Sequence, residues 1–200
     1  MHALFVTFSA EPGQVRELIR ASHDTMAPLV RSLPGFEGRN VLVDRRTGKI
    51  VVVIFFATEH DARRVASHAE FNRTRLSRRF AQGDVEEGVF EVTYRTADVD
   101  WSQARWARMT SYHVATGRMD ERIRHSLEVM EAPARAVPGR VGGSVLVDRP
   151  AHLSTSVSLW RSEKAMKASE EHIGFASARS HRRYAVGDVQ QDDLEVADAQ

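Results

Sequence analysis

Alternate residues of two extended segments in the second half of the chain have side chains that bind or activate small molecules. This row consists of Arg108, Thr110, Tyr112, Ser156, Ser158 and Trp160. A phenol can transfer a proton, a guanidinium can hold an anionic oxygen, and an indole can stack on a flat ring. Alternate residues of a strand point to one side of a sheet, so the row is expected on one face. Aromatic walls with a few polar groups are typical of ligand pockets.

Three further candidates fall in segments that are expected to form the helices over this face, and they are Ser126, His172 and Arg179. We expect Ser126 to contribute to binding, as the row residues Arg108, Thr110, Ser156, Ser158 and Trp160 do. Tyr112 and His172 are candidate acids or bases, and Arg179 is a candidate stabiliser of an anion. The alternatives are structural: a hydrogen bond at a helix end for His172, and a salt bridge on a solvated helix face for Arg179.

Composition excludes several classes of protein. The chain has 200 residues, 42% hydrophobic and 28% charged, with a net charge of +1 and no cysteine. It therefore has no disulfide, thiolate metal site or cysteine nucleophile. No apolar run approaches the roughly 18 residues of a membrane span, and no secretory signal is visible, so we expect a cytoplasmic protein without a membrane partner. Balanced charge without an aromatic platform argues against nucleic acid, and no metal-ligand spacing is present.

The elements that must position these residues follow from an internal repeat. Pro34-Gly35 and the segment Val41–Arg45 recur as Pro138-Gly139 and Val145–Arg149, an offset of 104 residues. About 29 of roughly 94 pairs at this offset are identical. The period is too long for a solenoid, so the sequence predicts two copies of one small domain, at 1–98 and 105–200.

Each copy is predicted to form the order β-α-β-β-α-β, which is the ferredoxin-like topology of an α+β domain. Alternation predicts strands and four-residue spacing predicts helices. In the first copy we expect strands at 4–9, 36–44, 49–56 and 85–94, and helices at 13–32 and from Thr58 to about Phe80. In the second copy we expect strands at 108–114 and 189–196 and helices at 118–136 and from Ser162 to about Tyr184. Thr58 and Ser162 are the expected N-caps.

Both faces of the predicted strand 49–56 are apolar, so both should be buried. Two linked copies can achieve this by packing their antiparallel sheets into one intramolecular α/β barrel. On the face that carries the polar row in the second copy, the first copy has only apolar residues: Leu4, Val6, Phe8, Val52, Ile54 and Phe56. We therefore interpret the first copy as a dry core and predict a pocket in the second. The alternative is that this face of the second copy is partly exposed, or that its hydroxyls bond to helix backbone.

A duplicated unit of this kind resembles the dimeric α/β-barrel superfamily. The segments 159–166, which begins Leu159-Trp160-Arg161-Ser162-Glu163, and 175–179 resemble the antibiotic-biosynthesis-monooxygenase (ABM) family, as does the turn Pro34-Gly35-Phe36. The resemblance implies a small-molecule enzyme, in some members a cofactor-free quinone-forming oxygenase and in others a haem-degrading one. Haem-degrading members use an asparagine and a histidine. The position of the asparagine corresponds to Val6 in the first copy and Thr110 in the second, and that of the histidine corresponds to Arg75 and Arg179. We therefore expect no haem, and no other cofactor.

The resemblance and the polar row together predict a cofactor-independent monooxygenase. Its substrate would be an aromatic or polyketide-like small molecule bound in the second domain. The alternative is a non-catalytic protein, either a small-molecule binder or a purely structural α/β barrel. Because one chain supplies both sheets, a monomeric barrel would suffice, and a homodimer is the other expectation.

Overall fold

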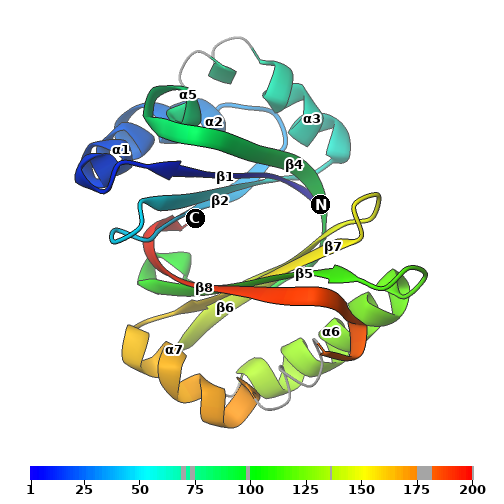
Figure 1. The fold of residues 1–200 in the computed structure, drawn as a ribbon. Coiled ribbons are helices and arrows are strands. Elements are labelled where there is room, and N and C mark those ends of the chain that lie inside the picture. The colour runs from blue at the N-terminus through cyan, green and yellow to red at the C-terminus, as the bar shows by residue number, and fades with distance from the viewer. Residues whose placement is uncertain (69–70, 73–74, 98–99, 136, 175–181, 200) are drawn as a thin grey trace. The chain divides into compact units, whose positions relative to one another are not determined.

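The fold is built from eight antiparallel strands (Figure 1). The structure is a computed structural model that describes residues 1–68, 71–72, 75–97, 100–135, 137–174 and 182–199. The strands of the first copy are β1 (His2–Ala10), β2 (Phe36–Val43), β3 (Lys49–Phe56) and β4 (Ala81–Arg95). Those of the second copy are β5 (Trp106–Val114), β6 (Arg140–Asp148), β7 (Leu153–Trp160) and β8 (Ala185–Ala199). The hydrogen-bonded strand order is that of a closed barrel, β1-β3-β2-β8-β5-β7-β6-β4. Within it, each copy has the predicted ferredoxin-like order, so the predicted fold class is confirmed.

Helices cover one side of the sheet in each copy (Figure 1). In the first copy they are η1 (Pro12–Gln14), α1 (Val15–Ala21), the π-helical turn η2 (Ser22–Met26), α2 (Ala27–Arg31), α3 (Glu59–Ser67) and α5 (Leu76–Phe80). The short helix η3 (Trp101–Gln103) precedes β5, and the second copy has α6 (Met119–Arg135), α7 (Glu163–Ser169) and the π-helical turn η4 (Glu170–Gly174). Both predicted N-caps are confirmed. The Thr58 hydroxyl accepts from the Asp61 N–H at 3.1 Å, and the Ser162 hydroxyl from the Ala165 N–H at 3.2 Å.

The last strand of each copy begins earlier than the sequence indicates. The sequence predicts that Gly83-Asp84 and Gly187-Asp188 separate helix from strand, but β4 already begins at Ala81 and β8 at Ala185. Gly83 and Gly187 have φ of +86° and +78°. Glycine adopts this left-handed conformation without steric cost, so an irregular residue can sit inside a continuing strand.

The two compact units of the chain combine segments of both copies. Unit 1 contains residues 1–91 and 195–200, and unit 2 contains residues 92–194. In unit 1 the end of β8 pairs with β2, with Asn40 opposite Ala199 and Val43 opposite Glu195. In unit 2 the chain just after β4 bonds to β6, where the Thr96 N–H donates to the Gly143 carbonyl at 2.9 Å. The end of each copy's last strand therefore completes the other copy's sheet.

Burial in unit 1 follows the predicted alternation. On one side of β3, Ile54 and Phe56 join a continuous apolar cluster with residues of the helices, among them Leu18. On the other side, Val51, Val53 and Phe55 are fully buried. Apart from the half-buried Val52, the apolar side chains on both faces of β3 are thus buried, as its sequence predicted.

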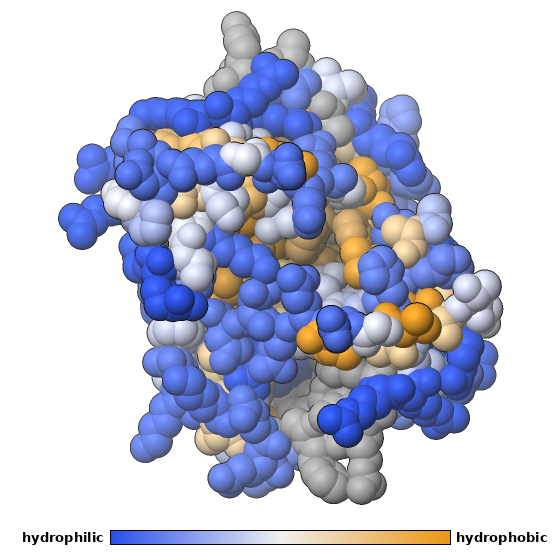
Figure 2. Space-filling view, in the orientation of Figure 1, coloured by the Kyte–Doolittle hydropathy of each residue, from blue (hydrophilic) through white to orange (hydrophobic). Residues whose placement is uncertain are grey.

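The exterior is mostly polar. Figure 2 shows a face on which hydrophilic side chains predominate and apolar ones gather in smaller patches. Four large hydrophobic side chains are exposed among the described residues, and they are Met1, Val85, Val186 and Val189. None of the described helices combines the length and the apolar character of a membrane span.

Candidate functional site

The polar row of the second copy lies on neighbouring strands of unit 2. Strands β5 and β7 are in register, with Arg108 opposite Ser158, Thr110 opposite Ser156, and Tyr112 opposite Ser154. The corresponding pairs of the first copy, on β1 and β3, are all apolar: Leu4 with Ile54, Val6 with Val52, and Phe8 with Ile50. The structure therefore brings the strand-borne candidates together as a ladder of polar pairs.

A buried arginine on α6 contacts this ladder. The Arg122 guanidinium donates from Nε to the hydroxyl oxygen of Tyr112 and from Nη1 to the Ser126 hydroxyl, and it lies 5.4 Å from the centroid of the Tyr112 ring. The exposed fractions of Arg122, Tyr112 and Ser126 are 3%, 2% and 4%. No carboxylate in the described parts of the chain forms an ion pair with Arg122. A charged group has thus been placed in the core beside two neutral hydroxyls.

Tyr112 is held as a neutral phenol. Burial raises its pKa above the usual value of 10, although the nearby charge of Arg122 and its hydrogen bond act in the opposite direction. Since Arg122 donates to the phenol oxygen, the Tyr112 proton is directed to a different acceptor. Tyr112 is therefore suited to donate a hydrogen bond, and poorly suited to act as a base near neutral pH.

Arg108 has its charge compensated within unit 2. Its Nε donates to Asp193 at 2.7 Å, and its Nη2 lies 3.0 Å from the same carboxylate and 2.8 Å from Glu170 of η4. The hydrogen bond from Arg108 to Asp193 raises the pKa of Arg108 further. With two carboxylates already bound, Arg108 ties β5 to β8 and to the helix side, and its guanidinium is less suited than that of Arg122 to attract an anion.

Trp160 ends the row at the last residue of β7. It is buried, and its indole N–H donates to the Ser158 hydroxyl at 3.0 Å. Thr110 is buried and Ser156 half-buried, and neither hydroxyl forms a hydrogen bond within the described parts of the chain. The row therefore keeps two hydroxyls that a ligand or water could satisfy.

Of the candidates on the helix side, Ser126 is held beside the row by Arg122, whereas His172 is not brought to it. His172, in the turn η4, is exposed. Arg179 lies outside the described residues. Among the side chains that the structure describes, no three histidine or carboxylate groups lie close enough together to hold a metal ion.

Arg122 is not among the candidates predicted from the sequence, which in this helix include Ser126 alone. A signal was present: Arg122 aligns with Leu18 at the offset of 104 residues, and Leu18 is fully buried in the first copy. Spacings of three and four residues also place Met119, Arg122 and Ser126 on one helix face.

Comparisons with known proteins identify solved structures with a similar fold. No family model matches the sequence, and no curated protein matches it significantly. A monooxygenase candidate from Fusobacterium nucleatum is 11% identical, with a TM-score of 0.78, over 100% of this chain and 93% of that chain. An anthrone oxidase-like protein is 16% identical, with a TM-score of 0.71, over 100% and 92% of the two chains. An uncharacterized ferredoxin-fold protein related to antibiotic biosynthesis monooxygenases, from Listeria monocytogenes, is 10% identical, with a TM-score of 0.60, over 98% and 94%.

The chain has the fold of the ABM-like proteins. At these identities the likeness establishes the ABM-like fold alone. The residues of the polar row differ between the two copies, so the ferredoxin-like unit is present twice while the polar row is present once.

Proposed function

We propose that the protein is a cofactor-independent monooxygenase whose substrate is an aromatic or polyketide-like molecule with an acidic phenol or enol. The proposed site lies in unit 2, over the polar row of β5 and β7. The observation that carries the proposal is Arg122, a buried guanidinium without a carboxylate partner among the described residues, set against Tyr112 where the first copy has Leu18 and Phe8. The names of the structural neighbours, which include an anthrone oxidase-like protein, support the same class of reaction.

The cost of burying Arg122 supports a functional role. A buried charge without a paired counter-charge costs several kcal/mol, so a stable core alone would favour the leucine of the first copy. An anionic ligand oxygen beside Arg122 would offset that cost. The Tyr112 hydroxyl, which accepts from Arg122, would donate its own proton to the same oxygen and strengthen the interaction.

These groups suit a reaction in which the substrate supplies the electrons. The ionised substrate gives its electrons to dioxygen, a carbon–oxygen bond forms, and loss of water from the resulting hydroperoxide leaves a ketone. For a methylene between aromatic rings, one dioxygen molecule converts the methylene into a carbonyl and releases one water molecule. The carbon is oxidised by four electrons and the two oxygen atoms are reduced by four. Arg122 and Tyr112 would stabilise the anion, and Trp160 would stack on its rings. The first proton would pass to solvent, since Tyr112 is a poor base.

The test is oxygen uptake with anthrone and with substituted anthrones, comparing wild type with Arg122→Leu and Trp160→Phe. We expect uptake with stoichiometric formation of the quinone, lost in the Arg122 variant. Arg124→Leu, at an exposed position of α6, is the matched control and should retain full activity. Absence of uptake across the panel, in a folded wild-type protein, would contradict the proposal.

The second candidate function is a non-catalytic binder of the same anions. It is favoured by one observation, that the described residues of the row include no group placed to accept a proton near neutral pH. A binder would show a ligand-dependent rise in melting temperature that Arg122→Leu removes, without oxygen uptake.

A further inference from the structure

A fully buried serine on β7 has no part in the mechanism above. Ser154 lies opposite Tyr112 in the register of β5 and β7, and its exposed fraction is 0%. Directly opposite residues of antiparallel strands point to the same face, with Cβ atoms about 5 Å apart. The Ser154 hydroxyl forms no hydrogen bond of good geometry within the described residues. Burying a hydroxyl in that state costs free energy, so packing alone does not explain a serine at this position.

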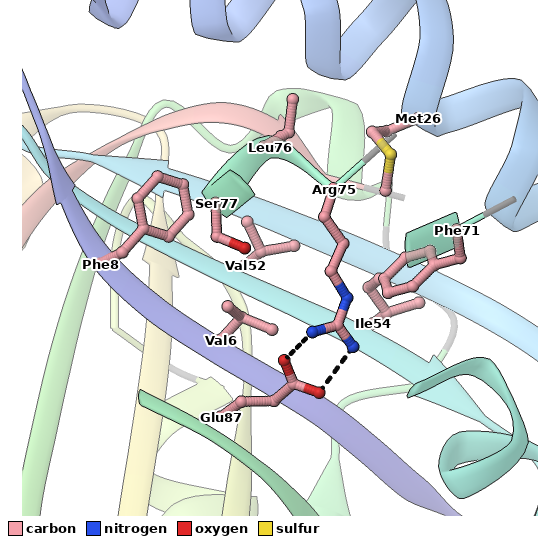
Figure 3. Close-up of a pocket in the computed structure, with 10 residues that line it drawn as sticks. All are labelled: Val6, Phe8, Met26, Val52, Ile54, Phe71, Arg75, Leu76, Ser77 and Glu87. Atoms are coloured by element: carbon pink, nitrogen blue, oxygen red, sulfur yellow. Dashed lines mark hydrogen bonds and ion pairs between the residues drawn. The ribbon is translucent and has the colours of Figure 1, made fainter. Parts of the chain in front are cut away.

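The first copy shows what this position contains when it serves only the core. Ile50 corresponds to Ser154 and Phe8 corresponds to Tyr112, and these two apolar residues are also directly opposite each other. Ile50 is completely buried in the apolar cluster of unit 1. Figure 3 shows Phe8 on the wall of a largely apolar pocket, whose volume of about 30 Å³ admits no more than water. The second copy therefore has a hydroxyl on both members of a pair that is purely apolar in the first.

The hydroxyl of Ser154 acts on the phenol of Tyr112. Burial raises the pKa of Tyr112 overall, and hydrogen bonding by Arg122 and by Ser154 opposes part of that rise. A neighbouring hydroxyl lowers the pKa of a phenol by donating to its oxygen, because this favours the charged form. Arg122 donates to the same oxygen from another direction. The phenol oxygen of Tyr112 thus has two donors beside it, one charged and one neutral.

We propose that Ser154 is a positioning residue, which donates to the Tyr112 oxygen and so directs the proton of Tyr112 to the bound anion. With Arg122 and Ser154 on its oxygen, the Tyr112 hydroxyl group points its own proton away from both donors. Successive hydrogen bonds polarise one another, so the bond from Tyr112 to the anion becomes stronger. This inference rests on the proposed function, because it concerns the same site. Ser154 acts through Tyr112 and does not itself touch the substrate.

The first measurement needs no substrate. The tyrosines are labelled with ¹³C at Cζ, and their ionisation is followed by NMR over the pH range in which the protein stays folded. Ser154→Ala should raise the pKa of Tyr112, because the phenolate loses a donor. Ser154→Thr keeps the hydroxyl and should restore the wild-type value, and the β-branched Ile50 of the first copy indicates that threonine fits here.

A matched control removes a buried hydroxyl elsewhere in the same sheet. Ser144 is 2% exposed and lies opposite Val157 of β7, on the face of the sheet that does not carry Tyr112. Ser144→Ala should leave the pKa of Tyr112 unchanged. Both alanine variants should keep a cooperative melting transition.

The second measurement is oxygen uptake with anthrone. Ser154→Ala should lower kcat about tenfold, the effect of losing one hydrogen bond that supports the transition state, and should change KM less than about twofold. Ser154→Thr should retain the wild-type kcat.

The two measurements separate this inference from the proposed function. An unchanged pKa of Tyr112 in folded Ser154→Ala would overturn the inference, whatever the activity. Oxygen uptake that Arg122→Leu abolishes and Ser154→Ala leaves intact would overturn the positioning role alone. A wild type without oxygen uptake, in which Ser154→Ala still raises the pKa of Tyr112, would overturn the proposed function and the positioning role with it, and would leave only the contact between the two hydroxyls.

Discussion

The Arg122 guanidinium donates a hydrogen bond to the phenol oxygen of Tyr112 and lies 5.4 Å from the centre of its ring, although both residues are almost completely buried. The equivalent pair in the first copy is Leu18 and Phe8, so one pair of positions has an apolar and a polar version in a single chain. That internal comparison allows the cost of the polar version to be measured directly.

We expect the double variant Arg122→Leu with Tyr112→Phe, which recreates the first copy's pair, to be at least as stable as the wild type. Replacing a buried polar or ionic group by apolar residues of similar volume is often neutral or stabilising by about 1 to 4 kcal/mol. Tyr112→Phe alone should be less stable than the double variant, because it leaves Arg122 without its phenol partner. Urea unfolding of the three proteins measures this. A double variant that is several kcal/mol less stable would show that the pair is structural.

The raised pKa of Tyr112 predicts a change in stability at alkaline pH. The pKa of Tyr112 is higher in the folded protein than its usual value of 10 in the unfolded chain. Its contribution to the free energy of unfolding is therefore fully present below pH 10 and is lost as the pH rises through the pKa of the folded protein. The free energy of unfolding of the wild type should therefore fall more steeply above about pH 10 than that of Tyr112→Phe. Parallel curves for the two proteins in urea titrations over this range would contradict the assignment.

A buried ion pair holds the end of β8 to β2. We therefore expect a substitution that removes the negative charge of this pair to lower the free energy of unfolding strongly. Arg39 is 2% exposed, and its Nε donates to Asp198 at 2.9 Å. Asp198→Asn leaves the buried guanidinium uncompensated, and breaking such a pair from one side costs about 3 kcal/mol or more. Glu195→Gln removes the partner of the half-exposed Arg45, which lies in the turn after β2, and should cost less than about 1 kcal/mol. Urea unfolding measures both variants, and equal losses in the free energy of unfolding would contradict the expectation that the buried pair contributes more than the exposed one.

A turn in the second copy carries strain that the first copy avoids. Gly48 has φ of +77°, and the aligned residue His152 has φ of +52° although it has a side chain. Glycine adopts this conformation freely, so His152→Gly should stabilise the protein by up to about 1 kcal/mol. In the reverse direction, Gly48→Ala should be strongly destabilising, since its Cβ would lie 1.9 Å from the Ala10 carbonyl oxygen. Melting temperatures that move the other way would contradict this reading of the two turns.

The repeat made most of the fold predictable. Matching residues at one offset identified both copies, and the alternating pattern of 49–56 correctly indicated burial on both faces. The N-caps of the helices that follow were predictable too, because Thr58 and Ser162 occupy the same position in the two copies. The exchange of strand ends was not predictable, because the residues that hold it, Arg39 and Asp198, lie 159 positions apart and are not repeated.

The site was predictable in part. Strand alternation placed Arg108, Thr110 and Tyr112 on one face, since a period of two depends on local geometry alone. It could not show that Arg108 is bound by Asp193 and Glu170, which come from distant segments. Nor did it identify the buried Arg122, because a charged residue on a helix is ordinarily assigned to the solvated face.

The most direct test of the central claim, that Arg122 and Tyr112 stabilise the anion of an oxidisable phenol or enol, is the rate of oxygen uptake with anthrone. We predict uptake by the wild type that increases with pH as the substrate ionises. Arg122→Leu should lower kcat/KM about 100-fold, as loss of one preorganised donor to a developing oxyanion does, with Arg124→Leu unchanged. Equal oxygen uptake by wild type and Arg122→Leu would contradict the account.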